Sequence, residues 1–269
     1  MRATGQLPAV AAGMALMLTA ACAGMTRQGS GVSYVIPPVL DVTRLLSPPP
    51  ADEAARARDL AAVRAAEQGR TASQSEHAEA SSSVDVFLFA AALGPRFAAE
   101  QLPITADFFD RVYRSALPHL QLTKNCWQRP RPFVADPTLM PLERSLASTR
   151  LRSAPAPAPA VPQPPADSPC TAPVADTSYS PSYPSGHATV GAMMAILLAQ
   201  MVPERRDALF ALGWEYGDAR VISGVHYPSD VEAGRILGTM LVGVMQEDRR
   251  FRADFAAARR ELRAVLQMK

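Results

Sequence analysis

The feature that most constrains the fold is a helical periodicity of apolar side chains, which begins near Ala51 and, apart from a Pro- and Ala-rich stretch, continues through the rest of the sequence. Apolar residues recur there at intervals of three and four positions, and runs of β-branched residues are few. This pattern predicts an all-α, single-domain helical bundle. We expect helices over 51–68, 76–93, 105–117, 119–127, 187–202, 204–223, 229–246 and 250–267. Four prolines stand at expected helix starts, namely Pro103, Pro118, Pro203 and Pro228.

The first 23 residues have the pattern of an export signal. Arg2 is followed by a mostly apolar stretch that carries no charge until Arg27 and is too short to span a membrane. Two cleavage sites fit: a lipoprotein-type cut before Cys22, and an ordinary Ala-x-Ala cut after residue 23. We therefore expect a periplasmic or secreted protein, or a lipoprotein whose only membrane attachment is a lipid on Cys22.

Changes in composition divide the remainder of the chain. A lead-in segment covers 24–50, and the expected domain covers 51–269. Within the domain, a Pro- and Ala-rich loop is expected over about 136–182, because the alternating Ala–Pro run at 154–159 cannot be helical. The later apolar stretches are too short or too polar to span a membrane.

The cysteines leave two alternatives open. If Cys22 is lipidated or removed, Cys126 and Cys170 remain, which is an even number in an oxidising compartment. They form either a disulfide or two unpaired thiols, and their spacing alone does not decide between the two.

The basic residues are unevenly chosen. The formal net charge is only +2, which argues against a nucleic-acid-binding surface. Lysine occurs only at Lys124 and Lys269. Since an ammonium and a guanidinium are not interchangeable at an anion site, the lone internal lysine points to Lys124 as functional, although an arginine-rich composition explains it equally well.

Lys124 opens the first of three motifs, Lys124-x6-Arg131-Pro132. The prolines on both sides of Arg131 disfavour a helix through it, so we expect Lys124 on a helix and Arg131 on the turn that follows. Arg131 could grip two oxygens of an oxyanion while Lys124 acts as a point charge. Arg129 also precedes a proline but lacks the motif spacing, and we assign it no role.

The second motif is Pro184-Ser185-Gly186-His187, which precedes an apolar helix. Ser185 is a typical N-cap, and Gly186 allows the backbone to approach an anion closely. The free N–H groups and the positive end of the helix dipole would face that anion. His187 would then be placed to donate a proton to a leaving group.

The third motif is Arg220-x5-His226-x3-Asp230. Gly224 is expected to end the helix that carries Arg220, and Asp230 falls in the first turn of the next helix. His226 lies on the short connection, where Asp230 could accept its Nδ1–H and leave Nε2 free to attack phosphorus. Asp230 could equally serve as a first-turn carboxylate, and the two roles are compatible.

Taken together, these residues supply an oxyanion site with a nucleophile and a proton donor, which indicates phosphoryl transfer. The three motifs, in this order, resemble those of the type 2 phosphatidic acid phosphatase (PAP2) superfamily, and specifically its class A bacterial non-specific acid phosphatases. The resemblance implies a bundle of the PAP2 and vanadium haloperoxidase type, a phosphohistidine at His226 and a general acid at His187. It further implies that the phosphoryl oxygens are held by Lys124, Arg131, Ser185, Gly186 and Arg220.

We therefore expect an exported acid phosphatase of broad specificity that acts on small phosphomonoesters. Alternatives are a vanadium-dependent haloperoxidase, a lipid-pyrophosphate phosphatase and a non-catalytic phosphate-binding protein. Binding alone would need no pair of histidines, which argues against the last. Homo-oligomers remain compatible with the sequence.

We expect no cofactor and no metal. His77 and His119 lack metal-ligand spacing, and three cations with a helix terminus could neutralise the transition state instead. Because His187 must be protonated and His226 neutral, we expect an acidic pH optimum. Tyr183, Trp127 and Phe133 flank the motifs and are candidates for the leaving-group side or for core packing.

Overall fold

The computed structural model describes residues 33–35, 40–149 and 180–268, and within them the chain forms helices and no strand. The all-α prediction is therefore confirmed for this part of the chain. The expected export signal with Cys22, the Ala–Pro run and Cys170 lie outside the described residues.

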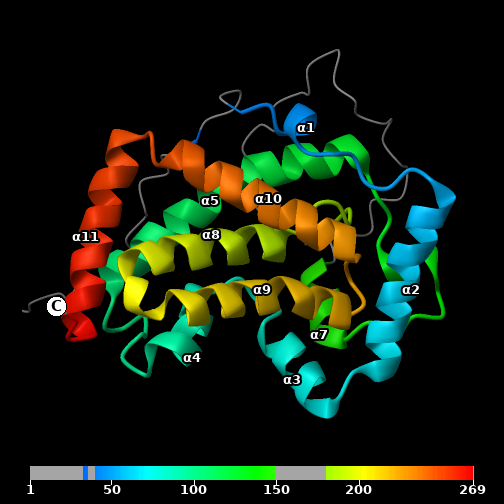
Figure 1. The fold of residues 1–269 in the computed structure, drawn as a ribbon, viewed down its shortest axis with the longest axis horizontal. Coiled ribbons are helices and arrows are strands. Elements are labelled where there is room, and N and C mark those ends of the chain that lie inside the picture. Colours follow the sequence, from blue (N-terminus) through cyan, green and yellow to red (C-terminus); the bar gives the residue numbers. More distant parts are fainter. Residues whose placement is uncertain (1–32, 36–39, 150–179, 269) are drawn as a thin grey trace, which may run out of the picture. The chain divides into compact units, whose positions relative to one another are not determined.

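Helix α8 (Gly186–Met201) is the central element. It packs extensively against α9 (Arg206–Ile222) and α10 (Pro228–Met245), between which it runs (Figure 1). It carries no Asp, Glu, Lys or Arg and is buried along most of its length, as expected of a helix that is apolar on every side. In the described part of the chain, no helix is both long and apolar enough to cross a membrane.

Glycines set the separation of α8 from α10. A Cβ atom at Gly234 would lie 2.5 Å from the carbonyl oxygen of Ser185, and one at Gly238 would lie 2.3 Å from that of Thr189. Any side chain at these positions would collide with backbone. The two helices therefore meet backbone to backbone, directly beside the first turn of α8.

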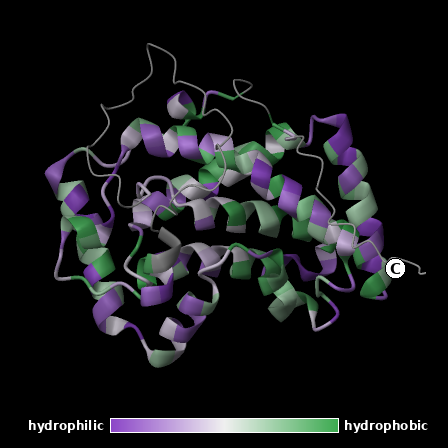
Figure 2. Cartoon of the chain, turned by 180° about the vertical axis from the view of Figure 1, so that it is seen from behind, coloured by the Kyte–Doolittle hydropathy of each residue, from purple (hydrophilic) through white to green (hydrophobic). Residues whose placement is uncertain are grey.

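Longer helices surround this centre. Helix α5 (Pro103–Trp127) packs against α11 (Arg249–Val265), α1 (Val42–Leu45) and α8, while α2 (Glu53–Gly69) packs against α9 and α10. Hydrophobic residues gather on the inner helices, and the outer helices carry hydrophilic ones (Figure 2). The shorter elements are α3 (Ala72–Ala80), η1 (Val86–Phe89), α4 (Ala90–Leu93), α6 (Pro132–Ala135), α7 (Glu143–Thr149) and η2 (Pro203–Arg205).

Two expected helices, 105–117 and 119–127, are one continuous helix, α5, with Pro118 inside it. The prediction that Pro118 starts a helix was wrong. A proline in a helix interior removes one hydrogen bond and costs about 3 kcal/mol. The long buried face of α5, which packs against three other helices, offsets that cost.

The expected helix over 76–93 is interrupted instead. Helix α3 ends at Ala80, and a serine segment, Ser81–Ser83, separates it from the 3₁₀ helix η1. Asp85 caps η1 by accepting a hydrogen bond from the Phe87 N–H at 2.9 Å. Serine and aspartate favour such non-helical, locally hydrogen-bonded conformations, which is why the helix stops here.

The expected loop over about 136–182 is not uniform. Its middle, residues 150–179, lies outside the described part of the chain. Helix α7 lies on one side of it, and Ser182 on the other side is fully buried. Both flanks of the segment are therefore built into the domain.

Candidate functional site

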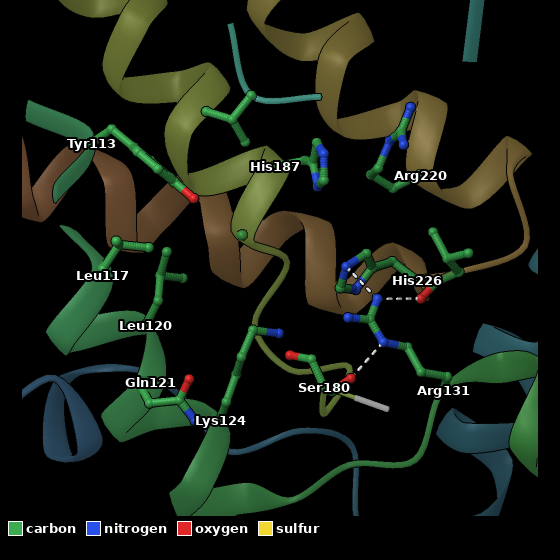
Figure 3. Close-up of a pocket in the computed structure, with 13 residues that line it drawn as sticks. Tyr113, Leu117, Leu120, Gln121, Lys124, Arg131, Ser180, His187, Arg220 and His226 are labelled. Atoms are coloured by element: carbon green, nitrogen blue, oxygen red, sulfur yellow. Dashed lines mark hydrogen bonds between the residues drawn. The ribbon is translucent and has the colours of Figure 1, made fainter. Parts of the chain in front are cut away.

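A cavity of about 220 Å³ lies where the three motifs converge (Figure 3). Six of the eight site residues expected from the sequence line it: Lys124, Arg131, Gly186, His187, Arg220 and His226. The other two, Ser185 and Asp230, are fully buried and do not line the cavity.

The end of α5 places the two cations of the first motif. Lys124 lies in the last turn of α5, which ends at Trp127. Gln128 then adopts the left-handed conformation, with φ at 45°, and reverses the chain. Arg131 follows in an extended conformation just before α6, so it lies on the turn after the helix, as the flanking prolines suggested.

Backbone carbonyl groups orient both of these cations. The Lys124 ammonium donates to the Pro181 carbonyl at 2.5 Å. Arg131 donates from Nε to the Ser180 carbonyl and from Nη1 to the Val225 carbonyl, both at 2.8 Å. Its remaining terminal nitrogen points into the cavity (Figure 3). Nε and Nη1 of Arg131 are thus used to orient the side chain, and the two N–H groups of Nη2 are left for a ligand.

The third cation, Arg220, is held from behind. Its Nη2 donates to the Ala78 carbonyl and, at 2.8 Å, to Ser81 Oγ, while Nη1 donates to Ser145 Oγ at 3.3 Å. Its Nε is buried and has no hydrogen-bond partner among the described residues. Because Arg220 lines the cavity, its positive charge lies beside any anion bound there.

The serine segment Ser81–Ser83 was not expected to belong to the site. Besides the contact of Ser81 with Arg220, the Ser82 carbonyl lies 2.9 Å from His187 Nε2, and the Ser83 carbonyl accepts from the Tyr216 hydroxyl. These oxygens are free because α3 ends before them. Three consecutive serines, which are weak helix formers, were the available sequence signal.

Burial and mutual repulsion make the cations receptive to negative charge. Burial and the nearby Arg131 hold the pKa of Lys124 well below its usual value, while Asp230 acts in the opposite direction. Burial also lowers the pKa of Arg131 and of Arg220 to about 10. A phosphate dianion between these groups would relieve the repulsion and stabilise all three charges.

The first turn of α8 has the geometry expected of the second motif. Ser185 is its N-cap, and its hydroxyl oxygen accepts from the Ala188 N–H at 3.3 Å. Gly186 and His187 are the first two residues of α8, so their N–H groups have no acceptor within the helix. Both residues line the cavity, which therefore lies at the positive end of the helix dipole. The structure thus assigns Ser185 a capping role, since its hydroxyl does not line the cavity.

His226 lies between an arginine and a carboxylate. Arg131 Nη1 is 2.7 Å from His226 Nε2, and Asp230 Oδ2 is 3.3 Å from His226 Nδ1. A guanidinium can only donate, so Nε2 must accept and the ring proton resides on Nδ1. Burial, followed by the charges of Arg131 and Lys124, lowers the pKa of His226 well below its ordinary value. The ring is therefore neutral, with its lone pair on Nε2.

Asp230 gathers four donors on its two oxygens. Oδ2 accepts from Ser182 Oγ at 2.5 Å and from the Tyr227 N–H at 3.0 Å, in addition to facing His226. Oδ1 accepts from Arg129 Nη1 at 2.6 Å. Asp230 therefore both caps α10 and orients His226. Ser182 and Arg129 are partners that the sequence did not identify, and Arg129 had been assigned no role.

His187 is oriented differently from His226. Its Nε2 lies 2.9 Å from the Ser82 carbonyl, which can only accept, so Nε2 carries a proton and Nδ1 is the nitrogen that titrates. Burial, then Arg220 and the other two cations, lowers the pKa of His187 to about 3. A bound phosphoryl group would act in the opposite direction because it offsets those positive charges.

The wall of the cavity opposite Arg131 is less polar. Tyr113, Leu117, Leu120 and Val84 line it, and the hydroxyl of Tyr113 points inward (Figure 3). The aromatic residues proposed for this side do not line the cavity. Trp127 and Tyr183 are buried edge to face, with ring centroids 5.1 Å apart, and the Tyr183 hydroxyl donates to the Ser47 carbonyl.

Phe133, the third aromatic candidate, packs with Val63, Leu139 and Tyr227 in a small cluster outside the cavity lining. All three flanking aromatic residues thus belong to the packing of the domain. Of the two alternatives left open for these residues, the structure agrees with core packing and not with a place on the leaving-group side.

Two further features concern metals and cysteines. Within residues 33–35, 40–149 and 180–268, no group of three or more His, Cys, Asp or Glu side chains is arranged to hold a metal ion. Cys126, next to the end of α5, is disulfide-bonded. Both other cysteines of the chain lie outside the described residues, so the pairing with Cys170 stays a prediction.

Comparison with known proteins identifies relatives with phosphatase names. The chain is 28% identical over 174 residues to an acid phosphatase of Zymomonas mobilis, which covers 65% of this chain and 55% of that protein. It is 43% identical over 81 residues to a non-specific acid phosphatase of Salmonella typhimurium, covering 30% of this chain and 32% of that one. A lipid A 1-phosphatase of Rhizobium johnstonii is 46% identical over 68 residues, 25% of this chain and 28% of that protein.

The chain thus spans about half the length of the first relative and about a third or less of the other two. The model of the PAP2 superfamily matches residues 112–252, which contain all three motifs and more than half of the sequence. Since that match and the convergence of the motifs on one cavity agree, this chain belongs to the PAP2 superfamily.

Proposed function

We propose that this protein is a phosphatase that hydrolyses phosphomonoesters through a phosphohistidine on His226. The observation that carries the proposal is the setting of His226. Its Nδ1 faces Asp230 at 3.3 Å, its Nε2 accepts from Arg131 Nη1 at 2.7 Å, and the residue lines a cavity together with Lys124, Arg131 and Arg220. The acid phosphatase names of the similar proteins from Zymomonas and Salmonella support the same reaction.

In the first step, His226 Nε2 attacks phosphorus. The N–P bond forms as the bond from phosphorus to the leaving oxygen breaks, and Asp230 stabilises the imidazolium character at Nδ1. Arg131 Nη1 exchanges its bond to Nε2 for one to a phosphoryl oxygen. Lys124, Arg220 and the first amides of α8 supply the remaining charge stabilisation.

His187 Nδ1 delivers a proton to the leaving oxygen in this step. In the second step the neutral His187 takes a proton from water as that water attacks phosphorus, the N–P bond breaks, and phosphate and free His226 are released. Protonation of His187 requires the phosphoryl dianion, since the surrounding cations otherwise lower the pKa of His187 to about 3. Substrate binding and proton uptake are therefore coupled, which favours turnover in acid.

We further propose that the enzyme works without a metal and accepts many leaving groups. Three cations and a helix terminus surround the position of the phosphoryl group, which supports charge neutralisation by side chains. The leaving group would lie toward Tyr113 and Leu117, where apolar side chains place few polar demands on it. Apart from the Tyr113 hydroxyl and the Gln121 amide, little there selects one alcohol over another.

Export is part of the proposal. The apolar first 23 residues have the pattern of a signal peptide, and the disulfide at Cys126 supports an oxidising compartment such as the periplasm. Fractionation of expressing cells would test this, and recovery of the full-length protein in the cytoplasm would contradict it.

The direct experiment is hydrolysis of p-nitrophenyl phosphate from pH 4 to 9, with and without EDTA, combined with acid-stable and acid-labile phosphate analysis of the quenched enzyme. We expect activity that survives EDTA, falls above neutral pH and is accompanied by an acid-labile phosphate on His226, identified by mass spectrometry. Turnover without any phosphorylated His226, in a quench fast enough to trap it, would overturn the covalent mechanism.

A further inference from the structure

We propose that Asp59 and Arg129 are positioning residues for the nucleophile, which act on His226 through Asp230. The inference rests on the proposed function of His226. Asp59 lies on α2, outside the segment that matches the superfamily model, and Arg129 lies on the turn between α5 and α6. An N-terminal helix would thereby contribute to the active site without touching substrate.

The first step of the argument is the position of Arg129. Its Nη1 is 2.6 Å from Asp230 Oδ1 and its Nη2 is 2.8 Å from Asp59 Oδ2, so one guanidinium bridges two carboxylates. The Arg129 side chain is 9% exposed and stacks on the ring of Tyr227, 3.8 Å from the ring centroid. Arg129 does not line the cavity, so it is not a phosphate ligand.

The second step is the fixation of Asp59. Its Oδ2 accepts a hydrogen bond from Ser229 Oγ, and its Oδ1 lies 3.4 Å from the Ser229 N–H at the start of α10. Ser229 Oγ in turn lies 2.7 Å from Arg129 Nη1. Asp59 therefore ties α2 to the turn of α10 that carries Asp230, and it also aligns the arginine.

The third step concerns charge. On its cavity side His226 faces Lys124, Arg131, Arg220 and His187, and behind it lies Asp230, whose other oxygen faces Arg129. An arginine paired with Asp230 alone would draw its negative charge away from His226. Asp59 shares that arginine, so Asp230 keeps more of its charge for the imidazolium that forms during attack.

The electrostatics of Arg129 agree with this arrangement. Burial acts to lower the pKa of Arg129, but Asp230 and Asp59 together raise it above the usual value. A guanidinium shared by two carboxylates is thus held as a fixed cation. The group most sensitive to its loss would be Asp230, which is fully buried.

The test uses the full chain and the variant Asp59→Asn, which keeps the shape of the side chain, removes its charge and replaces one of its two acceptor oxygens by an NH2 group. We expect kcat for p-nitrophenyl phosphate to fall about tenfold, within the range for coupled neighbours in one network. The inhibition constant of inorganic phosphate should stay within twofold, because the phosphate ligands are untouched. A role in folding alone would lower the fraction of active protein and leave kcat per active site, titrated by phosphohistidine, unchanged.

The matched control is Arg64→Gln. Arg64 also lies on α2 and pairs with Asp136 at 2.7 Å, so it ties α2 to the region after α6, but it does not reach Asp230. We expect no change in kcat. A fall in kcat as large as that of Asp59→Asn would attribute the effect to docking of α2 and would overturn the proposal.

A double-variant cycle guards against an indirect effect. If Asp59 acts through Arg129, then Asp59→Asn should lower kcat much less in an Arg129→Lys background than in the wild type. Equal effects in both backgrounds would overturn the proposal, as would an unchanged kcat in Asp59→Asn. Failure of the proposed function would appear separately, as a wild-type protein that forms no phosphohistidine.

Discussion

The two walls of the cavity differ in how firmly their side chains are held. On the charged wall, Lys124, Arg131 and Arg220 donate hydrogen bonds to the backbone carbonyls of Pro181, Ser180, Val225 and Ala78. On the opposite wall, Leu117 is 38% exposed, and no hydrogen bond to the Tyr113 hydroxyl is found among the described residues. One wall is preorganised, and the other is adaptable.

This difference indicates where selectivity resides. Groups fixed by the backbone lose little entropy when a phosphoryl group binds, so they can recognise its charge and shape closely. Contact with apolar side chains favours binding of almost any leaving group, because the hydrophobic effect is non-directional. Substitutions of residues on the charged wall should therefore have large effects on activity, and substitutions on the apolar wall should have small ones.

The largest effect is expected for His226→Ala. Removal of the nucleophile should lower kcat by at least about 10⁴-fold, the scale on which covalent catalysis is lost. Inorganic phosphate should still bind, because the three cations stay in place. The matched control is His77→Ala, an exposed histidine of α3 that should leave kcat unchanged. A variant that retained one per cent of wild-type kcat would contradict the assignment of His226.

A smaller effect is expected for the pH dependence of stability. His187 has a folded-state pKa of about 3, whereas an unfolded histidine titrates near about 6.5. The unfolded state therefore binds more protons below about pH 6.5, and stability is lost as the pH falls from there toward about 3. For His187 the slope is about 1.4 kcal/mol per pH unit.

Urea unfolding between pH 7 and 5 would measure the combined slope of His187 and of His119 and His226, whose pKa values burial also lowers. His187→Gln should flatten it, and added phosphate should flatten it in the wild type by raising the pKa of both cavity histidines. The lowered pKa values of Asp136 and Glu204 act in the same direction only at lower pH, so they do not disturb the comparison. An identical slope in His187→Gln would contradict the buried, neutral state of His187.

The smallest effect is expected for Tyr113→Phe, which removes only the hydroxyl that points into the cavity. For an ester whose leaving group carries a hydroxyl, such as glycerol 2-phosphate, kcat/KM should fall roughly two- to tenfold, the value of one hydrogen bond. For phenyl phosphate it should not change. The control is Tyr34→Phe. The Tyr34 hydroxyl donates to Asp254 Oδ2 at 2.7 Å, and Tyr34 does not line the cavity. Equal losses for both esters would show that Tyr113 does not contact the leaving group.

Local rules predicted the parts of the site that depend on neighbours in sequence. Ser185 caps α8, Pro228 begins α10, and Gly224 follows the end of α9 with a φ of +74°, all as the residue types indicated. Each of these features involves residues within a few positions of one another. The convergence of the cations followed from recognising motif order rather than from local physics.

Long-range contacts account for what the sequence did not reveal. Asp59 and Arg129 meet across 70 positions, and Ser81 and Arg220 across 139, so no periodic pattern marks either pair. Pro118 was misplaced for a related reason, since packing of α5 against distant helices outweighed a local preference. Arg129 was assigned no role from the sequence because the two carboxylates that it contacts, those of Asp59 and Asp230, are distant from it in sequence.

The backbone contact at Gly234 has a consequence for how this protein can change. The Ser185 carbonyl that Gly234 touches begins the helix of the second motif, and Gly234 itself lies one turn after Asp230 of the third. The gap between the second and third motifs of the candidate site is thus set by the absence of a single methyl group. Repacking of apolar side chains elsewhere cannot compensate for a wider gap. We therefore expect glycine to be required at position 234, while the residues that line the cavity can vary.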